Sequence, residues 1–148
     1  MELQNASTFP NKELSDLTTE DNPKGWRSAW TVGKFMKKND PLVIPYIDQI
    51  LEAIPHRNES HQRELLKIIT KLELNDDQVG IAFNIAVSLW ENLGKAPAVR
   101  YYSFKLLVKI GEKFPELKPE IKALANDQYI DSLTRGVKHS IIKITQTL

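Results

Sequence analysis

The chain has 148 residues and a formal net charge of +1, because its 20 Lys and Arg residues nearly balance its 19 Asp and Glu residues. This length predicts about one domain, which is large enough to bury a core without disulfides or metal. The sequence contains no Cys, which excludes disulfides, thiolate metal sites and cysteine nucleophiles. The near-neutral charge argues against a uniformly basic nucleic-acid-binding protein.

Neither a secretory signal nor a membrane-spanning segment is predicted. The first seven residues, MELQNAS, lack the basic and apolar regions that a secretory signal requires. Lys or Asp residues interrupt the longest apolar runs, which stay below the ~18 residues that a membrane helix needs. We therefore expect a cytoplasmic protein that makes no membrane contact.

Helices are predicted along nearly the whole chain. Residues 1–23 are polar and predict either a loosely ordered arm or a short helix at 11–19. From Pro23 onward, apolar residues recur with a helical period, and Asn, Asp, Pro or Gly residues separate the runs. Strict alternation of apolar and polar residues does not occur, so strands are not expected. The predicted helices, joined by short links that favour antiparallel neighbours, are 24–38, 41–54, 60–74, 77–93, 97–113, 115–128 and 132–147.

Every second helix carries an arginine near its start, and the spacing of these arginines is regular. Arg27, Arg63, Arg100 and Arg135 are separated by 36, 37 and 35 residues, and each precedes a similar apolar run. Self-similarity at a fixed period of this size is typical of helical repeat proteins.

Prolines also recur in the helices that lie between the arginine-bearing ones. Pro41 and Pro45 open one such helix, and Pro115 and Pro119 open another one 74 residues later, which is two periods. Because proline is tolerated in the first helical turn and not in a helix interior, the repeated pair predicts a repeated geometry at the start of the helix. The corresponding positions of the middle unit hold no proline, so the repeat is partial there.

A period of 35–37 residues with two helices per unit resembles HEAT repeats, and less closely armadillo repeats. The resemblance rests on the proline-containing first helices and on the Val99-Arg100 pair that opens a second helix before an apolar run. It implies an all-α fold, a right-handed α-α superhelix of HEAT-like antiparallel helix pairs; a compact helical bundle is the alternative. On this alignment, residues 1–23 form a polar arm or short capping helix, and residues 24–148 form a single repeat domain. The domain begins with a lone second helix at 24–38, which is followed by repeats at about 41–74, 77–111 and 115–146.

The tryptophans are expected to be buried. Trp26 and Trp30 are four residues apart and so share a helix face. We expect them to cover the N-terminal end of the stack, with an exposed aromatic anchor as the alternative. Trp90 is expected in the core.

Charge is distributed unevenly between the two kinds of helix. The resemblance implies that first helices line the convex side of the stack and second helices the concave side. The second helices hold 15 of the 20 basic residues and three acidic ones, a charge of +12, so the rest of the chain carries −11. Several of the basic residues recur at four-residue spacing and share a helix face. The candidate contact residues are Arg27, Lys34, Lys38, Arg63, Lys67, Lys71, Arg100, Lys105, Lys109, Arg135, Lys138 and Lys143.

Two roles are open for these side chains. The periodic arginines either contact a ligand or tie successive repeats together, and the lysines either contact a ligand or form solvated helix faces. An acidic segment of a protein partner and a nucleic-acid backbone are the ligand classes that fit a basic concave layer. We expect a non-catalytic binding or scaffold protein that engages an acidic partner, with nucleic-acid binding as the alternative.

No enzyme activity, cofactor, metal or small-molecule substrate is expected. Some bacterial HEAT-like proteins are DNA glycosylases that remove alkylated bases, and this family implies a carboxylate beside aromatic and Arg side chains on the concave face. The second helices offer Glu64, Glu73 and Glu112, and we expect each to be a surface ion-pair partner. The histidines lack the spacing of a metal-binding helix, and no glycine-rich phosphate-binding motif occurs.

Overall fold

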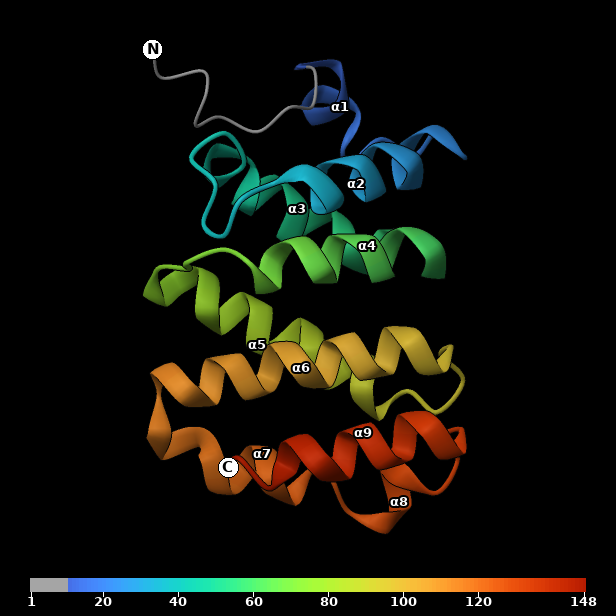
Figure 1. Ribbon diagram of the computed structural model, residues 1–148, viewed down its shortest axis with the longest axis vertical. Helices are drawn as coiled ribbons and strands as arrows, with labels where there is room; N and C mark the ends of the chain where they lie inside the picture. The colour runs from blue at the N-terminus through green and yellow to red at the C-terminus, as the bar shows by residue number, and fades with distance from the viewer. Residues whose placement is uncertain (1–10) are drawn as a thin grey trace. The chain divides into compact units, whose positions relative to one another are not determined.

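The computed structural model describes residues 11–148, and every regular element among them is a helix (Figure 1). The predicted all-α class is therefore confirmed, whereas residues 1–10 of the predicted arm lie outside the described residues. Contacts divide the chain into two compact units: unit 1 ends at Gln78, and unit 2 comprises Val79–Leu148. The handedness of a superhelix and the repeat boundaries stay predictions.

Unit 1 is built around two neighbouring helices, α2 and α4, which lie side by side (Figure 1). Small residues allow their close approach: a Cβ atom added to Gly33 of α2 would lie 3.4 Å from Cγ1 of Ile68 in α4. Ala29, Leu65 and Ile69 are among the buried side chains of this pair. The helices of this unit are α1 (Asn11–Asp16), α2 (Lys24–Phe35), the 3₁₀ turn η2 (Ile44–Tyr46), α3 (Ile47–Ala53), η3 (Ile54–His56), α4 (Glu59–Thr70) and the first residues of α5 (Asp76–Glu91).

The segment that precedes α2 covers part of unit 1. It forms α1, as the sequence predicts for this region, and it buries Leu14 and Leu17. The expected capping role of the two tryptophans is wrong for Trp30, which is 42% exposed, while Trp26 is half-buried. The apolar side chains that cover α2 therefore come from the segment that precedes it, which includes α1.

Polar contacts fix this segment to the rest of unit 1. The ring Nε2 of His61 lies 2.8 Å from the carbonyl oxygen of Leu17. Arg57 donates to the carbonyl oxygen of Thr18 through Nε at 2.9 Å and Nη2 at 2.6 Å. These bonds satisfy carbonyl groups of an irregular segment that would otherwise be costly to bury.

The repeated prolines lie at or just before helix starts, but equivalent members of the two pairs fall in different elements. Pro45 lies in η2, which comes directly before α3, and Pro115 opens the 3₁₀ turn η4 (Pro115–Leu117), which comes directly before α7 (Lys118–Ala123). Pro119 occupies the first turn of α7. The helix α5, which has no proline at its start, begins directly as an α-helix. The predicted helix at 41–54 therefore becomes α-helical only from Ile47.

Unit 2 packs around α6, and Trp90 lies in its core as predicted. The Trp90 ring is fully buried, its centroid is 4.8 Å from that of Phe104, and its Nε1 donates to the carbonyl oxygen of Leu124 at 2.8 Å. The single helix predicted at 115–128 is wrong: Asn126 caps a separate short helix by accepting from the amide of Gln128. Besides most of α5, with η4 and α7, this unit contains α6 (Pro97–Lys113), α8 (Asp127–Ile130) and α9 (Arg135–Thr145).

Candidate partner-binding surface

The predicted contact residues divide equally between the two units. We use the names α2–α4 surface and α6–α9 surface for the predicted contact residues that lie on or next to each of these two helix pairs. The α2–α4 surface includes Arg27, Lys34, Lys38, Arg63, Lys67 and Lys71, and the α6–α9 surface includes Lys105, Lys109, Arg135, Lys138 and Lys143 with Arg100 beneath it.

On α2, exposed cations alternate with exposed aromatic rings. The Nζ atom of Lys34 lies 4.7 Å from the ring centroid of Trp30 and 5.6 Å from that of Phe35, which is 47% exposed. Arg27 lies 5.9 Å from the ring of Trp26, and Lys38 is exposed just beyond the helix. Cation–π contacts at exposed sites contribute about 0.5–1 kcal/mol each, so they orient these side chains without removing their charge.

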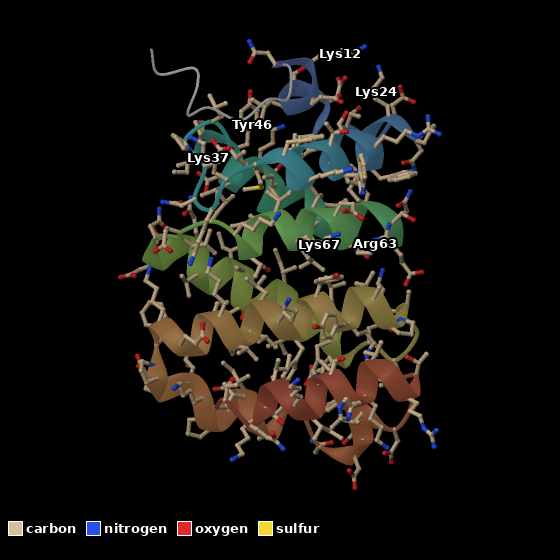
Figure 2. All side chains as sticks on the ribbon, in the orientation of Figure 1. Lys12, Lys24, Lys37, Tyr46, Arg63 and Lys67 are labelled. Carbon is tan, nitrogen blue, oxygen red and sulfur yellow. The ribbon has the colours of Figure 1, made fainter. Side chains whose placement is uncertain are left out.

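On α4, two of the predicted contact residues share one buried carboxylate. Arg63 Nε lies 2.8 Å from Glu64 Oε2, and Lys67 Nζ lies 3.3 Å from Oε1 of the same side chain, which is 4% exposed (Figure 2 labels both cations). The expected ion pairing of Glu64 is confirmed, but its expected place at the surface is wrong. A buried carboxylate is tolerated only when it is paired, so the three side chains together present a net charge of +1.

Lys71 links the end of α4 to α2. Its Nζ donates to the carbonyl oxygen of Gly33 at 2.5 Å, in the last turn of α2, where carbonyl groups lack helical partners. Burial, together with the positive charge of Lys67, lowers the pKa of Lys71. This contact gives Lys71 a structural role.

Arg100 has a structural role and is not available as a ligand contact, which were the two roles that the sequence left open for it. It is 1% exposed, and its guanidinium lies 4.6 Å from the ring centroid of Trp90. Nε donates to the carbonyl oxygen of Trp90 at 2.8 Å, Nη2 to that of Tyr129 at 2.5 Å and Nη1 to the hydroxyl of Ser132 at 3.2 Å. Burial lowers the pKa of Arg100. Arg27 and Arg135, at equivalent repeat positions, are exposed instead.

The α6–α9 surface also combines cations with aromatic rings. Lys105 Nζ lies 5.6 Å from the ring of Tyr101 and 5.8 Å from that of Tyr102, and the two rings meet edge to face with centroids 5.1 Å apart. On α9, Lys138 pairs with Asp131 at 3.2 Å. Lys109 is half-buried, and Arg135 and Lys143 are exposed.

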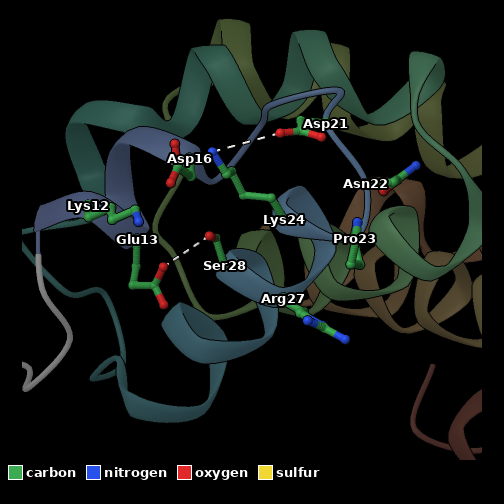
Figure 3. A pocket seen from close by; sticks show the side chains of 9 residues that line it. All are labelled: Lys12, Glu13, Asp16, Asp21, Asn22, Pro23, Lys24, Arg27 and Ser28. Carbon is green, nitrogen blue, oxygen red and sulfur yellow. Dashed lines mark hydrogen bonds and ion pairs between the residues drawn. The ribbon is translucent and has the colours of Figure 1, made fainter.

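Arg27 is one of the residues that line an open pocket between α1 and the start of α2 (Figure 3). Its charged lining is balanced, with three basic and three acidic side chains. Glu13 already accepts from the Ser28 hydroxyl at 3.0 Å, and Asp21 lies 3.7 Å from Lys24 Nζ. This charge balance gives the pocket no preference for an acidic ligand.

Residues 11–148 contain neither a cluster of metal-binding side chains nor a membrane-spanning helix. Within that range, no three His, Asp or Glu side chains are grouped so that they could hold a metal ion. None of the helices in the same range has the length and apolar character needed to cross a membrane.

A family model described as a HEAT repeat domain matches residues 4–148, so the chain belongs to the HEAT repeat domain family. The resemblance seen in the sequence is thereby confirmed, and the protein is a helical repeat scaffold or binding protein. No curated protein and no solved structure matches the chain.

Sequence reasoning gave the exposure of Trp30 only as the alternative to a capping role, and it missed the exposure of Phe35 and the burial of Glu64. The signal for the exposed rings was present: Gly25, Ala29 and Gly33 recur every four residues and form the stripe that packs against the neighbouring segments. Large side chains next to such a stripe are displaced toward solvent, as Trp30 is. No comparable signal marks Glu64, because its burial depends on tertiary packing.

Proposed function

We propose that this HEAT repeat domain is a non-catalytic binding or scaffold protein that engages an acidic segment of a protein partner through the α2–α4 and α6–α9 surfaces. The observation that carries the proposal is the environment of Lys34 and Lys105, whose charges lie against aromatic rings. Such lysines keep their charge for a ligand, and the rings beside them supply apolar contact area. The remaining contact residues of this proposal are Arg27, Lys38, Arg63, Lys67, Lys109, Arg135, Lys138 and Lys143.

Binding of a nucleic-acid backbone is the second candidate function, and the same aromatic rings favour it. Proteins that bind single-stranded nucleic acids stack the bases on exposed Trp, Phe and Tyr rings and pair the phosphates with neighbouring cations. Trp30 and Phe35 offer exposed rings in unit 1, and the half-buried rings of Tyr101 and Tyr102 lie beside Lys105 in unit 2. Base excision is disfavoured, because the buried carboxylate of Glu64 is already held by Arg63 and Lys67.

Titration of the full chain with labelled poly-Glu peptide, single-stranded RNA and duplex DNA, at about 50 and 200 mM salt, separates these functions. We expect the peptide to bind, and the double variant Lys34→Glu, Lys105→Glu to weaken that binding about tenfold by charge repulsion. The matched control is Lys12→Glu, Lys122→Glu, which reverses two exposed lysines of α1 and α7 outside both surfaces and should change binding less than about twofold.

The outcomes are distinct. A log–log salt slope near −4 to −5 on duplex DNA, with weaker peptide binding, would indicate about five phosphate contacts and favour the second function. Absence of binding to all three polyanions at the lower salt concentration would overturn both functions.

A further inference from the structure

Unit 2 carries a groove that the basic surfaces do not include. It lies between α5 and the α7 segment, and its volume is about 620 Å³. The hydrogen bond from Trp90 Nε1 to the carbonyl oxygen of Leu124 holds these two elements together. Because α5 spans 16 residues and α7 spans six, the shorter helix leaves part of the α5 face uncovered. The groove is lined by Phe83, Asn84, Val87, Ser88, Glu91, Asn92, Glu120 and Leu124.

The lining has an apolar part and an acidic part. Phe83, Val87 and Leu124 are half-buried, whereas Glu91 and Glu120 are exposed. Among the described residues, those that line the groove include these two carboxylates and no Lys or Arg. Its electrostatic preference is therefore for a cation, opposite to that of the α6–α9 surface.

Two further features favour a docked segment at this place. The Tyr129 hydroxyl donates to Glu91 Oε2 at 3.1 Å, which fixes one carboxylate in position. Ile81, which is 50% exposed, lies three residues before Asn84 on α5 and so extends the same helix face with apolar surface.

We propose that this groove, which we call the α5–α7 groove, binds a basic amphipathic helix of a protein partner. The apolar side chains of that helix pack on Phe83, Val87 and Leu124, and its Lys or Arg side chains pair with Glu91 and Glu120. Recognition of an amphipathic helix by an apolar groove is an established mode of peptide binding, and charge complementarity at the rim selects a cationic partner over a neutral or acidic one. The proposal is independent of the acidic-partner function and makes the domain a bridge between two partners of opposite charge.

The test uses the full chain and a short fluorescent helical peptide of Leu and Lys with leucines at helical spacing. We expect it to bind, and the double variant Glu91→Gln, Glu120→Gln to weaken binding about tenfold through loss of two ion pairs. Glutamine keeps an acceptor for Tyr129, and circular dichroism checks that the variant stays folded. The matched control, Glu112→Gln with Glu116→Gln, removes two exposed charges of unit 2 outside the groove lining and should leave affinity within about twofold.

Three results would overturn the proposal. One is equal weakening by the groove variant and by the control, and another is equal binding of a permuted peptide with the same composition and no helical period. The third is self-association that the groove variant abolishes, measured by analytical ultracentrifugation, since the occupant would then be a second copy of this chain. None of these results depends on poly-Glu or nucleic-acid binding, so the two proposals fail separately.

Discussion

In unit 1, four side chains, those of Arg57, His61, Gln62 and Lys71, each bind a backbone carbonyl group of a neighbouring segment. In unit 2, the guanidinium of Arg100 binds two such groups, one in the last turn of α5 and one in α8, as well as a hydroxyl. Both units thus satisfy carbonyl groups that irregular backbone and helix ends leave unpaired. Unit 1 distributes these bonds over four residues, whereas in unit 2 Arg100 makes two of them and Trp90 makes another, from Nε1 to the carbonyl oxygen of Leu124.

The comparison shows that a repeated residue need not have a repeated role. Arg63 and Arg100 are 37 residues apart, one repeat period. In unit 1, Gln62 already donates to the carbonyl oxygen of Ile54, in η3, at 2.9 Å. Arg63 pairs instead with Glu64 and keeps 37% of its side chain exposed. The repeat places each arginine at an equivalent backbone position, but the hydrogen-bond acceptors within reach determine whether its guanidinium is buried or exposed.

Replacing Arg100 with alanine is expected to give the largest effect, because it strands the two carbonyl groups and leaves a cavity. Each unsatisfied buried acceptor costs about 1–3 kcal/mol, so we expect Arg100→Ala to lower the free energy of unfolding by about 3–4 kcal/mol. The matched variant is Arg63→Ala, which leaves Glu64 paired with Lys67 and should cost about 1 kcal/mol. Urea denaturation followed by circular dichroism measures both values. Equal losses would contradict the concentrated role of Arg100.

A glycine substitution tests how tightly the N-terminal segment is held in unit 1. A Cβ atom on Gly25 would lie 2.3 Å from the carbonyl oxygen of Thr19 and 2.6 Å from the His61 ring, so backbone would have to move. We expect Gly25→Ala to cost about 2–3 kcal/mol. Gly136 of α9 has open space around it, and Gly136→Ala should stabilise by about 0.5–1 kcal/mol through helix propensity. Thermal melts of both variants check the opposite signs.

The sequence predicted the all-α class and the HEAT repeat family, because these depend on local spacing, but it joined separate elements in the helices predicted at 41–54 and 115–128. It also predicted the burial of Trp90 and the proximity of Glu64 to its basic partners, which are neighbours on one helix. It did not predict that Arg100 would be buried while Arg135 is exposed, because the difference depends on acceptors from α5 and α8. The same limit applies to the α5–α7 groove, which exists because the region after Pro115 breaks into short helices.

Protonation of His61 is expected to loosen the distributed contacts of unit 1, with the smallest of the three effects. Burial lowers the pKa of His61 below its ordinary value of 6.5; the bond to the carbonyl group of Leu17 opposes this shift, and the charge of Arg57 adds to it. The unfolded chain therefore binds this proton more readily than the folded one does. The stability that the neutral ring contributes is fully present above pH 6.5 and is lost as the pH falls below that value, by at most about 1.4 kcal/mol per pH unit for one proton.

Urea denaturation between pH 7.5 and 5.5 measures this slope, and His61→Gln is the variant that should flatten it. Glutamine is neutral throughout this range, and its amide group retains a donor for Leu17, so the comparison concerns the slope and not the absolute stability. The control is His139→Gln, because His139 is exposed on α9. An unchanged slope in His61→Gln would show that carboxylates set the acid sensitivity of unit 1. A slope that flattens in His61→Gln alone would identify α4 and the N-terminal segment as the part of the chain that acid opens first.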